Sequence, residues 1–146
     1  MLTLITAIPV IADTANFGTI SLAPGFDSSA ASISGYTGGS YSLSAISNRD
    51  VHNKACIGFA DPTPDHILVL QQEFSNLRIA VNSGGFDTTI VIQAPNGNVY
   101  CGDDTGRSKD ASVVVNNLKA GSYKVWVGTF NPNVKVNYTL SIQQPK

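Results

Sequence analysis

The sequence predicts an all-β fold, a single antiparallel β-sandwich of the jelly-roll or Greek-key kind with about eight strands. Three observations support this prediction: short runs in which apolar and polar residues alternate, turn residues between those runs, and no sustained helical period. The length of 146 residues suits one domain. We therefore expect one sandwich over residues 13–146.

The composition agrees with a folded domain and limits the classes of partner that we expect. Hydrophobic residues make up 42% of the chain and charged residues 13%, which is enough apolar material to bury a core. The formal net charge is -1, and the nine Lys and Arg residues are scattered. Because no basic patch is visible, we expect neither nucleic acid nor anionic lipid as a partner.

The first twelve residues, MLTLITAIPVIA, form an apolar stretch too short to cross a bilayer as a helix. This stretch is similar to the second half of a signal peptide, with Val10 and Ala12 at the small-residue positions before a cleavage site. The mature chain would then begin at Asp13 and contain no membrane span. A positively charged region is missing before the stretch, so an N-terminal β-strand is the alternative.

Strand-like runs follow along the first half of the chain. The runs 17–22 and 41–46 are separated by segment 23–40, which is rich in Ser and Gly and is predicted as a long loop or a weak strand. The runs 67–70 and 77–82 come next. Every second residue of 77–82 is a large aliphatic one, which is typical of a half-buried antiparallel strand.

A hairpin is the clearest prediction in the second half. Ala94-Pro95-Asn96-Gly97 supplies the fixed and positive φ values of a tight reversal, so 88–93 and 98–101 should pair. The run 111–115 follows. Further on, Leu118, Gly121 and Tyr123 resemble the corner of Greek-key sandwiches, where a tyrosine hydroxyl bonds back to the chain.

The last two strand-like runs are 123–130 and 135–143. In the second run the apolar residues Val136, Tyr138, Leu140 and Ile142 alternate with polar ones, so one face should be buried and the other solvated. We find no linker that would mark a second domain and no internal repeat.

Two cysteines, Cys56 and Cys101, form an even count in a chain with features of an exported protein, which predicts a disulfide. In the chain-entropy model a bridge closing a loop of about 45 residues stabilises the fold by about 4 kcal/mol. Two buried free thiols are the alternative. A cysteine-bound metal is not expected, because there is no CxxC pair and His52 and His66 stand at no ligand spacing.

Four motifs occur in an order that resembles a known family. They are Pro64-Asp65-His66, Gly85-Phe86-Asp87-Thr88-Thr89, Cys101-Gly102-Asp103-Asp104, and Ala120-Gly121-Ser122-Tyr123 with Val125-Trp126-Val127-Gly128. Together they resemble a pre-peptidase C-terminal (PPC-like) domain in the form found in cyanobacterial exported proteins. The resemblance covers about residues 40–143.

The resemblance implies a jelly-roll-like β-sandwich in a secreted, periplasmic or extracellular protein. Such domains are often appended to secreted peptidases or stand alone. They are distantly similar to the collagen-binding domains of bacterial collagenases, some of which bind calcium. This chain has no peptidase attached, which departs from the arrangement in which the domain assists a protease within the same chain.

We therefore expect an exported, non-catalytic binding or structural module at the cell surface or in the periplasm. Its partner would be a protein or a polysaccharide at the cell surface. An accessory role in a secreted peptidase system is one alternative. A self-assembling extracellular subunit is another, because edge strands of a sandwich can pair between copies.

The sequence gives little support for an enzyme. His52 lies in a polar segment and His66 begins an apolar strand, where it should pack at the rim of the sandwich with its ring bonded to backbone. Neither histidine is accompanied by a nucleophile elbow, an HExxH pair or a phosphate-binding loop. Asp103 and Asp104 are a weak carboxylate dyad, because neighbouring residues of a strand point to opposite sides.

Calcium is the cofactor that the residues suggest. Asp87 opens a strand, Asp103 and Asp104 follow the hairpin which that strand begins, and Asp110 lies a few residues on. These carboxylates should meet at one end of the sheet, where they could supply oxygen ligands to a hard cation. The segment does not match an EF-hand. The alternative is that the aspartates cap turns through their own backbone amides.

A possible ligand or partner surface comes from the run 123–130. Alternation sends Tyr123, Val125 and Val127 to one face and Trp126 and Phe130 to the other. If the first face is core, Trp126 and Phe130 form an apolar shelf for a protein or sugar. The alternative is that a loop covers Trp126 and makes a second small core.

Overall fold

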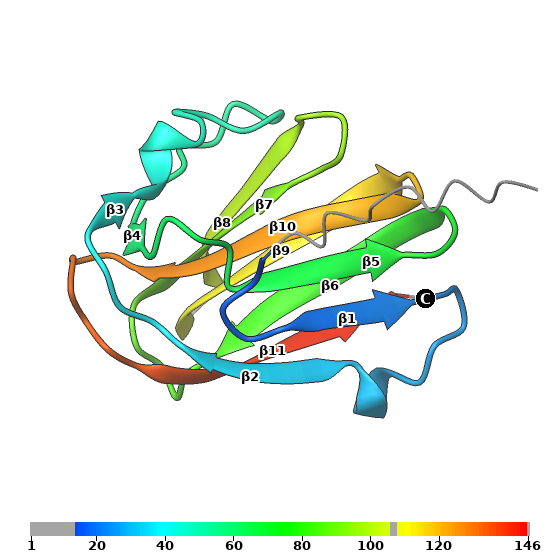
Figure 1. Ribbon diagram of the computed structural model, residues 1–146, viewed down its shortest axis with the longest axis horizontal. Helices are drawn as coiled ribbons and strands as arrows, with labels where there is room; N and C mark the ends of the chain where they lie inside the picture. Colours follow the sequence, from blue (N-terminus) through cyan, green and yellow to red (C-terminus); the bar gives the residue numbers. More distant parts are fainter. Residues whose placement is uncertain (1–13, 106–107, 146) are drawn as a thin grey trace, which may run out of the picture.

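The computed structural model describes residues 14–105 and 108–145, which form a two-layered β-sandwich (Figure 1). The predicted signal-like segment and its cleavage positions, Val10, Ala12 and Asp13, lie outside the described residues. The described part of the chain contains eleven strands, more than the eight predicted, and two single 3₁₀ turns. Their bounds are β1 Thr19–Leu22, η1 Ser28–Ala30, β2 Ser32–Tyr36, β3 Tyr41–Ser42, η2 Leu43–Ala45, β4 Phe59–Ala60, β5 His66–Leu70, β6 Phe74–Asn82, β7 Thr88–Gln93, β8 Val99–Thr105, β9 Ser108–Leu118, β10 Gly121–Thr129 and β11 Asn137–Gln143.

The first layer has the strand order β1-β5-β10-β7-β8, and β4 pairs with the end of β10. The second layer has the order β8-β9-β6-β11-β2. All pairs are antiparallel, as predicted, except that β1 runs parallel to β5. Between them the chain crosses to the other layer to form β2 and then returns, which allows the parallel pairing.

Strand β8 belongs to both layers. Its first part pairs with β7 as far as Gly102, and from Asp103 onward it pairs with β9. A Cβ atom on Gly102 would clash with the carbonyl oxygen of Ser112 and would lie 2.8 Å from Cγ2 of Ile90. Glycine therefore allows the close approach of backbones at the point where β8 passes from one layer to the other.

One segment differs from the sequence prediction. Only Tyr41 and Ser42 of the predicted strand 41–46 are extended, and the chain then turns through η2. Segment 23–40, predicted as a long loop or a weak strand, contains the edge strand β2, which pairs with β11. The sequence of β2, SISGY, has few residues with high β-propensity, so its pairing with β11 and the packing of Ile33 on the core define it.

The main core fills the space between the two layers. Tyr123, Val125 and Val127 are buried in it, as the alternation predicted. The Tyr123 hydroxyl donates a hydrogen bond to the carbonyl oxygen of Lys119 at 2.7 Å, which confirms the predicted tyrosine corner. The predicted hairpin is also present, with Gly97 at a φ of 91° in the turn between β7 and β8.

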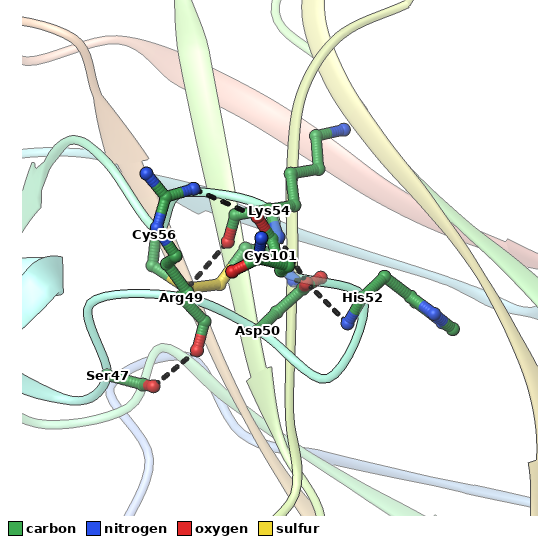
Figure 2. The surroundings of a disulfide bond; sticks show 8 residues. Ser47, Arg49, Asp50, His52, Lys54, Cys56 and Cys101 are labelled. Carbon is green, nitrogen blue, oxygen red and sulfur yellow. Dashed lines mark hydrogen bonds between the residues drawn. A yellow bond between two sulfur atoms is a disulfide. The ribbon is translucent and has the colours of Figure 1, made fainter.

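A second, smaller core lies on the outer face of the first layer. The segment 43–60 folds over β7, β8 and β10, and the disulfide fixes it there (Figures 1 and 2). Cys56 and Cys101 form this predicted bridge, with their Cα atoms 5.3 Å apart. The buried residues of this second core are Leu43, Cys56, Ala60, Val91, Val99, Cys101 and Trp126.

No helix among residues 14–105 and 108–145 is long and apolar enough to cross a membrane.

Candidate metal-binding site

Three of the four predicted metal ligands meet where β7 begins and β8 joins the second layer. Asp87 immediately precedes β7, and Asp103 and Asp104 follow Gly102 on β8. One carboxylate oxygen from each of the three lies within 4.8 Å of the others. Asp87 and Asp103 are half-buried and Asp104 is exposed, so this acidic cluster opens to solvent.

The cluster concentrates negative charge around Asp103. Burial raises the pKa of the Asp103 carboxyl, and the neighbouring charges of Asp104 and Asp87 raise it further. The Oδ1 atom of Asp103 is buried and accepts no hydrogen bond from any residue in the described part of the chain. A cation placed between the three carboxylates would relieve this repulsion and would give that oxygen a partner.

Adjacent residues of a strand were expected to point apart, but Asp103 and Asp104 both reach Asp87. The strand is irregular here, because β8 changes layers at Gly102 and its pairing register with β9 shifts between Asp104 and Thr105. The regular alternation of side chains therefore does not hold at this point. The expectation that the carboxylates of Asp103 and Asp104 point to opposite sides of the strand was wrong.

Asp110 was predicted to join this site, but it lies outside the acidic cluster that the described residues form. Its carboxylate accepts hydrogen bonds from the backbone N–H groups of Ser83, at 3.1 Å, and Gly85, at 3.2 Å. It also accepts one from the hydroxyl of Ser83. Asp110 of β9 thus anchors the turn between β6 and β7, which is distant in the sequence, whereas the alternative had been a cap through its own backbone amides.

The predicted shelf of Trp126 and Phe130 is not exposed as a unit. Trp126 does face away from the main core, but segment 43–60 covers it and leaves 5% of it accessible. Its indole N–H donates a hydrogen bond to the carbonyl oxygen of Pro62 at 3.1 Å. The prediction of an exposed Trp126 was wrong, and the covered arrangement that we considered as its alternative is the one observed.

Phe130 is exposed, and its aromatic neighbour at the surface is Phe86. Both side chains are about half exposed, and with Val134 they line a small hollow of about 170 Å³ beside Asp87. The backbone N–H of Phe130 donates to the carbonyl oxygen of Asp87 at 3.1 Å. The apolar surface therefore adjoins the acidic cluster, and Phe86, which the sequence reasoning did not single out, contributes to it.

The two histidines lie in different environments. His52 is exposed in a turn of segment 43–60. His66 is fully buried, and its Nε2 atom lies 2.8 Å from the hydroxyl of Tyr138. The predicted bond from the His66 ring to backbone was therefore wrong, because a tyrosine of the opposite layer supplies the partner.

Burial perturbs both titratable groups at the start of β5. It lowers the pKa of His66 to about 4, which keeps the ring neutral. It raises the pKa of Asp65 to about 7, against hydrogen bonds from the backbone N–H of Val127 and the side chain of Asn16. Perturbed pKa values occur at functional sites. Because Asp65 and His66 are both buried, we interpret this pair as a structural one.

No family model matches the chain, and no curated protein sequence matches it. One similar solved structure is the pre-peptidase C-terminal domain of a collagenase from Bacillus anthracis, with 16% identity, a TM-score of 0.48, and coverage of 86% of this chain and 94% of that one. Another is CorA, a surface-associated copper-binding protein important in copper acquisition by Methylomicrobium album BG8, with 11% identity, a TM-score of 0.47, and coverage of 87% and 100%. The first of these is a bacterial collagenase domain, the kind of protein to which the sequence predicted a distant similarity.

Proposed function

We propose that this chain is an exported, non-catalytic binding module that acts at a cell surface or in the periplasm, and that Asp87, Asp103 and Asp104 bind a calcium ion. The observation that carries the calcium proposal is the approach of three carboxylate oxygens to within 4.8 Å of one another. Calcium takes six to eight oxygen ligands. Water and backbone carbonyls would complete the set.

The chemistry of the donors favours calcium over a transition metal. All three side chains offer carboxylate oxygen, whereas copper and zinc prefer imidazole or thiolate ligands. The two cysteines are joined to each other in the disulfide, and His66 is buried against Tyr138. Since neither ligand type belongs to the acidic cluster, a hard cation is the best fit.

The disulfide supports the proposed location, because such bonds persist in oxidising compartments outside the cytosol. The exposed surface of Phe86, Phe130 and Val134 supports a binding role, because apolar side chains grouped at a surface mark contact sites. We retain Phe130 as a partner-surface residue and assign Phe86 to it in place of Trp126.

The calcium proposal is tested by thermal unfolding of the purified chain with calcium and with a chelator. A ligand that binds only the folded state stabilises it by about 2.7 kcal/mol at a hundredfold excess over Kd, which should raise Tm by about 8 °C for a domain of this size. Asp104→Asn should remove most of this increase, because it deletes one charge from an exposed ligand position. The chelated variant should unfold at nearly the wild-type temperature.

Asp27→Asn is the matched control. Asp27 is exposed, lies outside the acidic cluster and accepts a hydrogen bond from the backbone N–H of Ser29, which an asparagine oxygen can also accept. This variant loses the same charge and should keep the full calcium response. An equal response in wild type and Asp104→Asn, or no response of the wild type to millimolar calcium, would show that these aspartates hold no calcium.

A further inference from the structure

The outer face of the second layer carries small polar side chains in register across its strands. Ser34 of β2 pairs with Thr139 of β11, which pairs with Asn82 of β6. These positions point to solvent because their sequence neighbours, such as Leu140 and Val81, are buried in the main core. The face therefore presents a row of hydroxyl and amide groups.

A shallow, open hollow of about 460 Å³ lies along this row. Its walls include Tyr36, Asn137 and the three residues of the polar row, and none of its lining side chains is charged. Tyr36 follows Ser34 on the same face of β2, and it is 49% exposed.

The Tyr36 ring is positioned by its neighbours and stands between two hollows. Phe17 contacts it in an edge-to-face arrangement with ring centroids 4.8 Å apart, and the Lys135 ammonium lies 4.6 Å from its centroid. A second hollow of about 250 Å³, lined in part by Thr37 and Asp61, adjoins the other side of the ring. An elongated ligand could therefore extend past the ring in both directions.

We propose that this face binds a neutral oligosaccharide, with a sugar ring against Tyr36 and its hydroxyls on Ser34, Asn82 and Thr139. Hydroxyl and amide groups both donate and accept hydrogen bonds, as sugar hydroxyls do. The part of the Tyr36 ring that Lys135 and Phe17 leave exposed offers an apolar surface to the C–H face of a pyranose.

No side chain that lines the larger hollow is charged, and the Lys135 ammonium beside it lies over the Tyr36 ring, so the hollow itself offers an anionic ligand no ion-pair partner. A protein partner is also disfavoured, since protein interfaces are depleted in serine and bury a central apolar patch. The inference extends the proposed binding role to one ligand class, and it uses none of the calcium-binding residues.

The test is a titration of the isotope-labelled chain with cellohexaose, laminarihexaose, maltohexaose and chitohexaose, each to about 5 mM, followed by amide chemical shifts. At least one sugar should shift the amide resonances of Ser34, Tyr36 and Thr139 in a saturable manner. No saturable shift with any of the four, or shifts confined to other surfaces, would overturn the proposal.

Variants then separate recognition from folding. Tyr36→Ala should weaken the binding of the selected sugar by at least about tenfold, as the loss of a central aromatic contact does. Thr139→Val removes one exposed hydroxyl without changing shape or β-propensity, and should weaken binding several-fold. Val51→Ala, a change of a similarly exposed apolar residue that lines neither hollow, should leave the affinity unchanged. Unaltered affinity in both groove variants would exclude this site.

The calcium proposal and the sugar proposal can be tested independently of each other. Asp104→Asn should keep its sugar affinity, and Tyr36→Ala should keep its calcium-dependent rise in Tm. If the chelated wild type binds the sugar as well as the calcium-loaded protein does, the sugar site stands without calcium. A sugar response that disappears with chelator would contradict the assignment to this face.

Discussion

The carboxylate of Asp50 accepts a hydrogen bond from the backbone N–H of Cys101 at 3.0 Å (Figure 2). Its other oxygen accepts from the backbone N–H groups of His52, at 2.8 Å, and Lys54, at 2.9 Å. Partial burial opposes ionisation of Asp50, but these three hydrogen bonds outweigh it and lower the pKa of the carboxyl. One side chain thus organises the turn that precedes Cys56 and attaches it to β8.

Replacing Asp50 should therefore loosen segment 43–60 even when the disulfide is intact. Asp50→Ala leaves three backbone N–H groups without their acceptor and should lower the free energy of unfolding by about 2 kcal/mol. Asp50→Asn keeps one acceptor oxygen and should cost less. Urea unfolding of the oxidised proteins measures both, and equal losses in the two variants would contradict the role of the hydrogen bonds.

The disulfide itself should contribute more than any one of these hydrogen bonds. It joins residues separated by 45 positions, and closing such a loop stabilises the fold by about 4 kcal/mol in the chain-entropy model. The double variant Cys56→Ala and Cys101→Ala should show a loss of this order in urea. The variant without the bridge should also be insensitive to reducing agent, whereas reduction should destabilise the wild type.

Trp126 should contribute to stability as a core residue. Its side chain is 5% exposed beneath segment 43–60, so Trp126→Ala should cost about 3 to 5 kcal/mol. Phe130→Ala is the control, because Phe130 is 52% exposed and its truncation should cost less than about 1 kcal/mol. Trp126 is the only tryptophan, so its fluorescence should be blue-shifted and poorly quenched by iodide. Red-shifted, quenchable emission would indicate that the ring is exposed.

The outcome at Trp126 shows what alternation can and cannot predict. A period of two places Trp126 opposite Val125 and Val127, and the structure has this arrangement. Alternation does not say what lies over the outer face. The cover comes from segment 43–60, whose Leu43 and Cys56 are far from Trp126 in the sequence and lie outside the strands, in a stretch without a periodic pattern.

The candidate site was predictable to a similar extent. Asp87, Asp103 and Asp104 meet because the β7–β8 hairpin fixes which residues share an end of the sheet, and the Pro-Asn-Gly turn identified that hairpin. Asp110 depends instead on the conformation of the turn after β6, which no sequence motif specified. Tyr36 was missed because it lies in a Ser- and Gly-rich segment, although the alternation of Ser32, Ile33 and Ser34 before it was a weak strand signal.

Asp65 and His66 form a buried pair at the start of β5, and burial shifts their pKa values in opposite directions. The folded protein holds the Asp65 proton up to about pH 7, whereas the ordinary pKa is 3.8, so this group's contribution to stability is present at low pH and is lost as pH rises through about 7. The folded protein keeps His66 neutral down to about pH 4, whereas the ordinary pKa is 6.5. The His66 contribution is therefore present above pH 6.5 and is lost as pH falls toward 4.

Because the two contributions oppose each other between about pH 4 and 6.5, the wild type should show little net pH dependence from this pair. Single variants should separate them. In Asp65→Asn only His66 titrates, so the free energy of unfolding should fall on acidification through that range. In His66→Gln only Asp65 titrates, so the free energy of unfolding should rise as pH is lowered from about 7 toward 4. Urea unfolding across this range measures both slopes. If the slopes of the two variants have the same sign, at least one of these buried groups does not titrate as its burial implies.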